Sequence, residues 1–192
     1  KLPISVKHRT GVDDFDSYDF LCDFVETVSN TGCKTFIIHA RKAWLKGLSP
    51  KQNREVPELN YDRVYQLNKD FPELEIIING GISSIQDSVD HLHQLDGVMI
   101  GREAYANPYL LAEVDQKIYG KEKSIIKREE IAEKFCQYVD NEMVKGEKLH
   151  SMTRHILGLF RGVKGAKQFR RHISEKAQGE TASVDVLYDA LK

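Results

Sequence analysis

The feature that most constrains the fold is a change of sequence pattern near residue 120. Before it, short runs of β-forming residues alternate with stretches that repeat apolar residues at helical spacing, which is typical of βα units around a parallel sheet. Strands are predicted at 4–8, 34–39, 75–79 and 97–100, and helices at 18–30, 61–70 and 84–92. From about residue 124 the strand pattern is lost, so a second architecture is predicted there.

This second part is predicted to be all-helical. Apolar residues recur at helical spacing at 127–144, 150–160, 166–174 and 183–191, and glycines separate these stretches. Gly120 and the charged residues 121–123 form the predicted linker. The predicted domains are therefore 1–120, with an α/β fold, and 121–192, with an all-α fold.

Four βα units are half of an eight-stranded (β/α)8 barrel, although strand counting alone equally allows a small doubly wound sheet. An open half-barrel would expose strand edges and the apolar layer that fills a barrel interior. Either the remainder of a barrel or self-association of the chain is therefore expected to cover it. The chain begins with Lys1 instead of Met and enters a predicted strand almost at once, so we expect it to be part of a longer protein.

The composition argues against several classes of protein. A hydrophobic content of 41%, a charged content of 30% and a formal net charge of −1 are unlike those of a disordered chain. No apolar run approaches the roughly 20 residues of a membrane-spanning helix, so no membrane partner is predicted. The three cysteines are odd in number and widely spaced, which favours core positions in a reducing cytoplasm over disulfides or a metal site.

Informative residues follow the predicted strands, because parallel α/β folds bind ligands beyond the carboxyl ends of their strands. Asn79, Gly80 and Gly81 end the third strand and lead toward a helix, so backbone amides can approach a phosphate there. Gly101 and Arg102 repeat this design after the fourth strand, and the guanidinium of Arg102 suits bidentate phosphate binding. The alternative is a pair of ordinary glycine turns.

Two further residues belong to the first two strands. Period-2 alternation places Lys7 on the face opposite Ile4 and Val6, and an ammonium in a barrel interior would need an anionic partner such as a reduced flavin. His39 closes the second strand. A solvated lysine and a structural histidine are the alternatives.

Two basic regions indicate a polyanion partner. The 40–60 loop is longer than most βα connections and carries Trp44 with Arg41, Lys42, Lys46, Lys51 and Arg54. Residues 145–176 contain nine Lys or Arg and two acids, which is a net charge of +7. The helical spacing of these tail cations predicts a phosphate-contacting face, formed by Arg154, Arg161, Lys164, Lys167, Arg170 and Arg171. Merely solvated charges are the alternative for both regions.

The strings VKHRTGVDD, FIIHARKAWLKGLSPKQNREVPELNY, IIINGGI and DGVMIGREAYANPYLL together resemble the tRNA-dihydrouridine synthases, specifically the bacterial A-type. The resemblance implies the second half of an FMN-binding (β/α)8 TIM barrel followed by a helical tRNA-binding domain. It also implies a cytoplasmic flavin-dependent oxidoreductase that reduces uridines of the tRNA D-loop to 5,6-dihydrouridine, with NADPH recharging the FMN.

Carried over by position, the resemblance assigns FMN binding to Lys7, His39, Asn79, Gly80, Gly81, Gly101 and Arg102. Lys7 would stabilise the pyrimidine edge of the flavin, and the glycines with Arg102 would hold its phosphate. Contacts with tRNA are assigned to Lys51, Arg54, Lys167 and Arg170, and Arg41 and Lys42 of the same basic loop are added to them.

One departure limits what this chain is expected to do. The family's catalytic cysteine lies in an Asn-x-Gly-Cys-Pro-like loop, and no such string occurs here, so no catalytic residue is assigned. We therefore expect the chain alone to lack turnover and to bind FMN weakly or not at all. The alternatives are a non-catalytic RNA-binding module, or another FMN-barrel oxidoreductase that acts on a small molecule.

Overall fold

The computed structural model describes residues 2–122, 124–179 and 181–192. The chain forms two compact units, Lys1–Gly101 and Arg102–Lys192, which we call the sheet unit and the helical unit. The boundary predicted near residue 120 lies within the range of the helical unit and stays a prediction. Residue 123 of the predicted linker lies outside the described residues.

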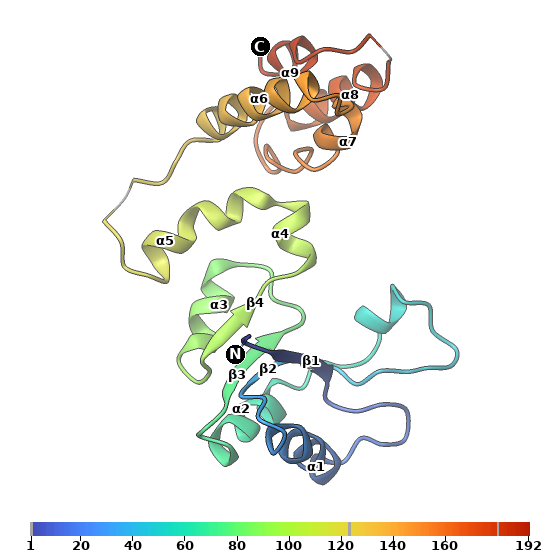
Figure 1. Ribbon diagram of the computed structural model, residues 1–192, viewed down its shortest axis with the longest axis vertical. Coiled ribbons are helices and arrows are strands. Elements are labelled where there is room, and N and C mark those ends of the chain that lie inside the picture. Colours follow the sequence, from blue (N-terminus) through green and yellow to red (C-terminus); the bar gives the residue numbers. More distant parts are fainter. Residues whose placement is uncertain (1, 123, 180) are drawn as a thin grey trace. The chain divides into compact units, whose positions relative to one another are not determined.

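The sheet unit contains four parallel strands in the order β1-β2-β3-β4, with bounds Ser5–Arg9, Thr35–His39, Glu75–Asn79 and Gly97–Met99 (Figure 1). Each predicted strand lies within one residue of these bounds, so the strand predictions are confirmed. The sequential order differs from that of a doubly wound sheet, in which the strand order reverses at a switch point. All four carboxyl ends therefore meet at one edge of the sheet.

Three helices, α1 (Tyr18–Ser29), α2 (Tyr61–Asp70) and α3 (Ile85–Leu92), follow the first three strands. Side-chain oxygens of Ser17 and Asn60 accept from amides in the first turns of α1 and α2, which stabilises both helix starts. Apolar side chains of α1 and α2 and alternate residues of β2 and β3 are buried in one core, which includes Leu21, Val25, Val64, Leu67, Phe36, Ile38, Ile76 and Ile78. Each such side chain contributes about 1.5–3 kcal/mol of burial free energy.

The opposite face of the sheet is only partly covered within the sheet unit. By the strand register, this face carries Lys7 and Arg9 of β1, Ile37 and His39 of β2, and Ile77 and Asn79 of β3. Ile37, Ile77 and Asn79 are half-buried, and Lys7 is exposed. The sheet therefore has one packed face and one open face, and the candidate polar residues lie on the open one.

His8 of β1 lies on the packed face, where its ring contacts Phe24 and Phe36. Its Nδ1 donates to the carbonyl oxygen of Arg9 at 2.8 Å, so Nε2 is left as an acceptor. That atom is buried and has no hydrogen-bond partner among the described residues. Burial accordingly lowers the pKa of His8, and the fold favours the neutral ring.

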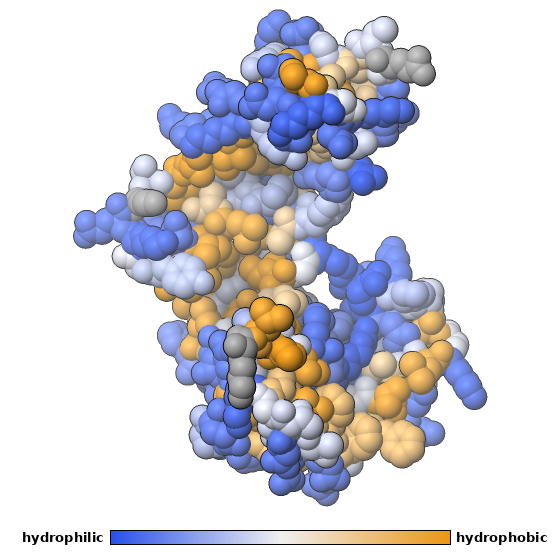
Figure 2. All heavy atoms as spheres, in the orientation of Figure 1, coloured by the Kyte–Doolittle hydropathy of each residue, from blue (hydrophilic) through white to orange (hydrophobic). Residues whose placement is uncertain are grey.

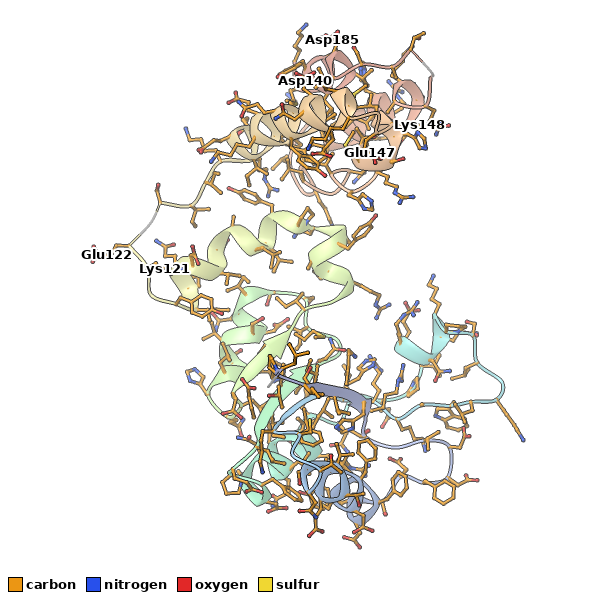
Figure 3. All side chains as sticks on the ribbon, viewed as in Figure 1. Lys121, Glu122, Asp140, Glu147, Lys148 and Asp185 are labelled. Carbon is orange, nitrogen blue, oxygen red and sulfur yellow. The ribbon has the colours of Figure 1, made fainter. Side chains whose placement is uncertain are left out.

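The helical unit comprises α4 (Arg102–Ala106), a 3-10 helix η2 (Pro108–Glu113), α5 (Val114–Lys117), α6 (Arg128–Val144), α7 (Leu149–Thr153), α8 (Ala166–Lys176) and α9 (Asp185–Ala190). Its core includes Cys136, Val139, Leu159, Ile173 and Leu187. Polar and charged side chains cover most of α6 on the face that Figure 2 shows. Lys121, labelled in Figure 3, follows α5 and forms an ion pair with Asp115 at 3.1 Å.

The helix predicted at 150–160 is wrong in extent, because α7 ends at Thr153. The backbone then continues in turns, with amides of His155 and Ile156 donating to carbonyls three residues earlier. Gly158 lies within this stretch of turns. A Cβ there would lie 2.4 Å from the carbonyl oxygen of Ala106, so residue 158 packs directly on the backbone at the end of α4.

Candidate cofactor and nucleic-acid sites

The open face of the sheet brings together two predicted residues that are 72 positions apart in the sequence. Lys7 Nζ donates to Asn79 Oδ1 at 3.2 Å. Since β1 and β3 both flank β2, the lysine side chain reaches over β2 to make this bond. Partial desolvation and the charge of Arg9 lower the pKa of Lys7, so a nearby anion would be favourable at its ammonium.

Asn79 connects this lysine to the next strand. Its Nδ2 donates to the carbonyl oxygen of Met99 at 2.8 Å, which fixes the direction of the amide. A Cβ added at Gly101 would lie 3.9 Å from the same Nδ2. The Asn79 and Gly101 turns therefore lie side by side. The protein itself leaves ordinary van der Waals space at Gly101, so packing does not explain the glycine there.

The turn of Gly80 and Gly81 is different, because both glycines have positive φ angles, of 111° and 72°. A Cβ at Gly80 would lie 2.4 Å from His39 Cδ2, and one at Gly81 would lie 2.6 Å from Leu59 Cδ1. The hydroxyl of Tyr61 also donates to the carbonyl oxygen of Gly80 at 2.9 Å. Glycine is therefore required here by the packing of the turn itself, in addition to any ligand.

Asp87 occupies the start of α3, where an anion was predicted to bind. Its Oδ2 accepts from the amides of Ser83 and Ser84, each at 3.1 Å, and Ser84 caps the helix in return. Burial alone would raise the pKa of Asp87, but these hydrogen bonds outweigh it and lower the pKa. A phosphate at this turn would therefore be restricted to amides that precede Ser83.

Arg9 is a functional candidate that the sequence reasoning missed. It lies two residues after Lys7 on the same face of β1, so the same alternation argument could have found it. Its guanidinium donates to the carbonyl oxygens of Lys42 and Asn53, each at 2.8 Å, which anchors the 40–60 loop to the strand. Burial and the charges of Arg41 and Arg54 lower the pKa of Arg9.

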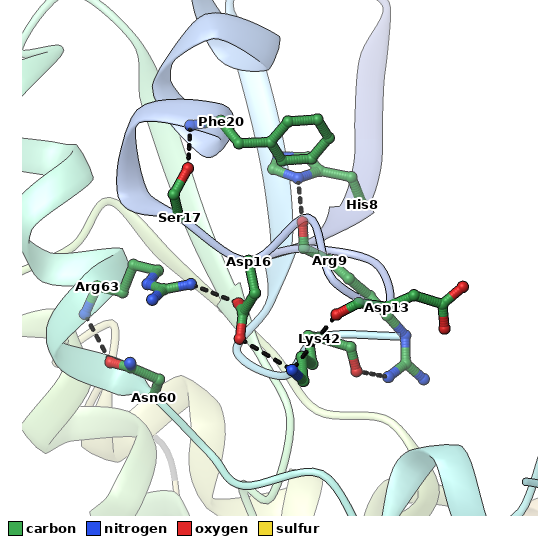
Figure 4. A network of polar contacts seen from close by, with 9 residues as sticks. All are labelled: His8, Arg9, Asp13, Asp16, Ser17, Phe20, Lys42, Asn60 and Arg63. Carbon is green, nitrogen blue, oxygen red and sulfur yellow. Dashed lines mark hydrogen bonds and ion pairs between the residues drawn. The ribbon is translucent and has the colours of Figure 1, made fainter. Parts of the chain in front are cut away.

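The predicted cations of the 40–60 loop divide into two groups. Arg41 donates to the carbonyl oxygens of Glu55 and Pro57, so it holds the loop closed. Lys42 pairs with Asp16 at 3.2 Å, and Asp16 also pairs with Arg63 at 2.7 Å (Figure 4). In contrast, Lys51 and Arg54 are exposed at the short 3-10 helix η1 (Gln52–Arg54).

In the helical unit, α8 separates an apolar side from a basic one. Phe169 and Ile173 are buried in the core of the unit, whereas Lys167 and Arg170 are exposed. Arg102, the last predicted flavin-phosphate residue, begins α4. Gly101 ends the sheet unit, so the predicted Gly101–Arg102 turn joins the two units in the chain.

Comparison with known proteins identifies the class. The family model described as "Dihydrouridine synthase (Dus)" matches residues 1–192, so this chain belongs to the dihydrouridine synthase family. Among similar curated proteins, the tRNA-dihydrouridine(20/20a) synthase of Vibrio vulnificus is 55% identical over 99% of this chain and 59% of its own length. Those of Salmonella typhimurium and Escherichia coli K12 are 53% identical over the whole chain and over 58% and 56% of their lengths.

The chain therefore spans somewhat more than half the length of these relatives. Across the described residues, no helix is both long and apolar enough to cross a membrane.

Proposed function

We propose that this chain is the cofactor-holding and RNA-binding portion of an FMN-dependent tRNA-dihydrouridine synthase. In this proposal the parallel sheet is half of a (β/α)8 barrel, and its open face turns toward the missing strands. A helical tRNA-binding domain begins near residue 121. The sequential parallel strand order and the half-exposed Ile37 and Ile77 on the open face support the barrel.

The contact between Lys7 and Asn79 beside the glycine turns carries the proposal. Bound FMN would supply the hydride that reduces uracil in tRNA, with NADPH as the source of electrons. Lys7 would place its positive charge at the pyrimidine edge of the flavin, and Asn79 would orient that lysine. His39 would line the same edge of the sheet.

The flavin phosphate is proposed to bind where the two glycine turns meet. Because Asp87 occupies the amides of Ser83 and Ser84, the phosphate would contact the backbone of Gly80 and Gly81 instead. The open space at Gly101 suits close approach of the ligand, and Arg102 would supply a charged fork.

The RNA is proposed to contact both basic regions. Lys51 and Arg54 present exposed charges from η1, and Lys167 and Arg170 present them from α8. Arg41 and Lys42 would act by holding the loop as well as by their charge, since both make contacts within the sheet unit. Phosphate contacts of this kind position an RNA without reading its sequence.

The protein is proposed to be cytoplasmic. The isolated chain is proposed to have no catalytic turnover. Cys33 and Cys136 are buried, and burial raises the pKa of Cys22, so none resembles an exposed proton donor. Without the rest of the barrel, the chain would act as an RNA-binding module without catalysis. Self-association through the open face of the sheet would be one way to cover it.

The test is to measure RNA binding and turnover by the purified chain. We expect it to shift an unmodified tRNA transcript in a salt-dependent manner, and to form no dihydrouridine detectable by mass spectrometry when FMN and NADPH are supplied. The double variant Lys167→Gln/Arg170→Gln should flatten the slope of log affinity against log salt by about two, whereas Lys134→Gln on α6 should not. Undetectable RNA binding would contradict the proposed substrate, and robust dihydrouridine formation would contradict the proposed inactivity.

A further inference from the structure

Away from the sheet, the helical unit contains a chain of hydrogen bonds between exposed side chains. Arg154 Nε donates to His155 Nε2 at 3.1 Å. Nδ1 of the same ring lies 3.1 Å from the hydroxyl of Tyr105 on α4. The two rings also pack edge to face, with centroids 5.8 Å apart and an interplanar angle of 80°. Three side chains from two segments are therefore linked by hydrogen bonds into one cluster.

The direction of these bonds follows from the chemistry of the groups. A guanidinium can only donate, so Nε2 of His155 must accept from Arg154. The single N–H of the neutral imidazole is then on Nδ1, and it donates to the Tyr105 oxygen. The hydroxyl proton of Tyr105 is consequently available for an acceptor outside the chain. The exposed end of this cluster is thus the Tyr105 hydroxyl, a hydrogen-bond donor on a side chain that is 60% exposed.

The backbone around these three side chains is closely packed. Because a Cβ at Gly158 would lie 2.4 Å from the Ala106 carbonyl oxygen, residues 105–106 are held near residues 155–158. Glu103, the acid two residues before Tyr105 on α4, is paired with Arg161 at 3.0 Å. An incoming anion would therefore meet the guanidinium of Arg154 and the Tyr105 hydroxyl without facing an uncompensated charge from Glu103.

We propose that Tyr105, His155 and Arg154 form a binding site for one phosphate of an RNA backbone. Phosphate oxygens accept only, so they match a site whose exposed groups all donate. The inference rests on the proposed tRNA substrate and adds Tyr105 and His155 to the contacts. Arg102 and Tyr105 share α4, so this phosphate would bind one helical turn away from the proposed flavin-phosphate residue.

Tyr105→Phe tests the site because it removes the hydroxyl and keeps the ring. Fluorescence anisotropy with a labelled, unmodified tRNA transcript should show about tenfold weaker binding. The salt slope should not change, since the lost donor is neutral, whereas Arg154→Met should lower the slope by about one. His155→Phe should weaken binding as much as Tyr105→Phe, because the ring would no longer orient the hydroxyl.

Two control variants remove matched groups elsewhere on the helical unit. Tyr138→Phe changes a tyrosine on a different helix, α6, whose side chain is 52% exposed. Lys134→Met removes a cation of the same helix that pairs with Glu130. Both should bind within about twofold of the wild type. If the wild type binds tRNA tightly and Tyr105→Phe binds it with the same affinity, the proposed phosphate site is wrong but the proposed tRNA substrate is not. A wild-type chain that binds no tRNA would overturn the proposed substrate along with it.

Discussion

Replacement of Gly80 by alanine is expected to destabilise the sheet unit by about 2–6 kcal/mol. The φ angle of 111° is one that residues with a Cβ rarely adopt, and this strain costs about 1–3 kcal/mol. The new Cβ would also lie 2.4 Å from His39 Cδ2 and 2.9 Å from Nε2. Overpacking of a buried ring adds about 1–3 kcal/mol. A loss of this size is a large fraction of the stability of a typical domain.

Gly32→Ala is the matched control for this variant. Gly32 has a similar φ angle of 101°, but nothing lies within 4 Å of the position of its Cβ. It should therefore show the backbone strain alone, about 1–3 kcal/mol. Trp44 is the single tryptophan and lies in the sheet unit, so its fluorescence during urea denaturation reports on this unit. Equal losses in the two variants would mean that His39 does not restrict the turn.

Replacement of Gly158 by alanine is expected to destabilise the helical unit by about 2–4 kcal/mol. The φ angle of Gly158 is not positive, so the effect comes from contact alone. The Cβ would lie 2.4 Å from the Ala106 carbonyl oxygen and 2.8 Å from its carbon, and backbone atoms cannot rotate away as side chains do. We also expect weaker tRNA binding, because the Tyr105 and His155 pair would separate.

The control here is Gly179→Ala, which also has no positive φ angle and whose nearest neighbour would be 3.9 Å away. It should change stability by less than about 0.5 kcal/mol. Hydrogen exchange of α6 and α8 amides, read by mass spectrometry, measures the stability of the helical unit directly. Slow, wild-type exchange in Gly158→Ala would show that the segment relaxes without cost.

The strands could be predicted from sequence because each is a short apolar run ended by turn residues. Ile76, Ile77 and Ile78 are followed by Asn79 and two glycines, and β3 ends at that asparagine. The short helices between residues 102 and 117 were not predicted, since four to six residues are too few to show a helical period. The turns after Thr153 were also missed, because their shape depends on a contact of Gly158 with a segment about 50 residues earlier.

The candidate site was predicted in part. Alternation along β1 placed Lys7 on the face opposite Val6, which is where the structure has it. The sequence could not show that its partner within the chain is the neutral amide of Asn79. The anchoring role of Arg9 depends on carbonyl groups from the distant 40–60 loop. Asp87 at the start of α3 could have been found, because Ser84 and Asp87 have the spacing of a capping box. Because Asp87 occupies the amides of Ser83 and Ser84, a phosphate can bind only to amides that precede them.

The central claim is that the edge of the sheet formed by the carboxyl ends of its strands binds the phosphate and the ring of a flavin. A titration of the 15N-labelled chain with FMN, followed by NMR, tests it directly because the method detects weak binding. We predict saturable shifts at millimolar FMN that are concentrated at Lys7, Gly80, Gly81 and Gly101, and much smaller shifts with riboflavin, which lacks the phosphate. Shifts confined to the helical unit, or shifts at these four residues that are as large with riboflavin as with FMN, would contradict the account.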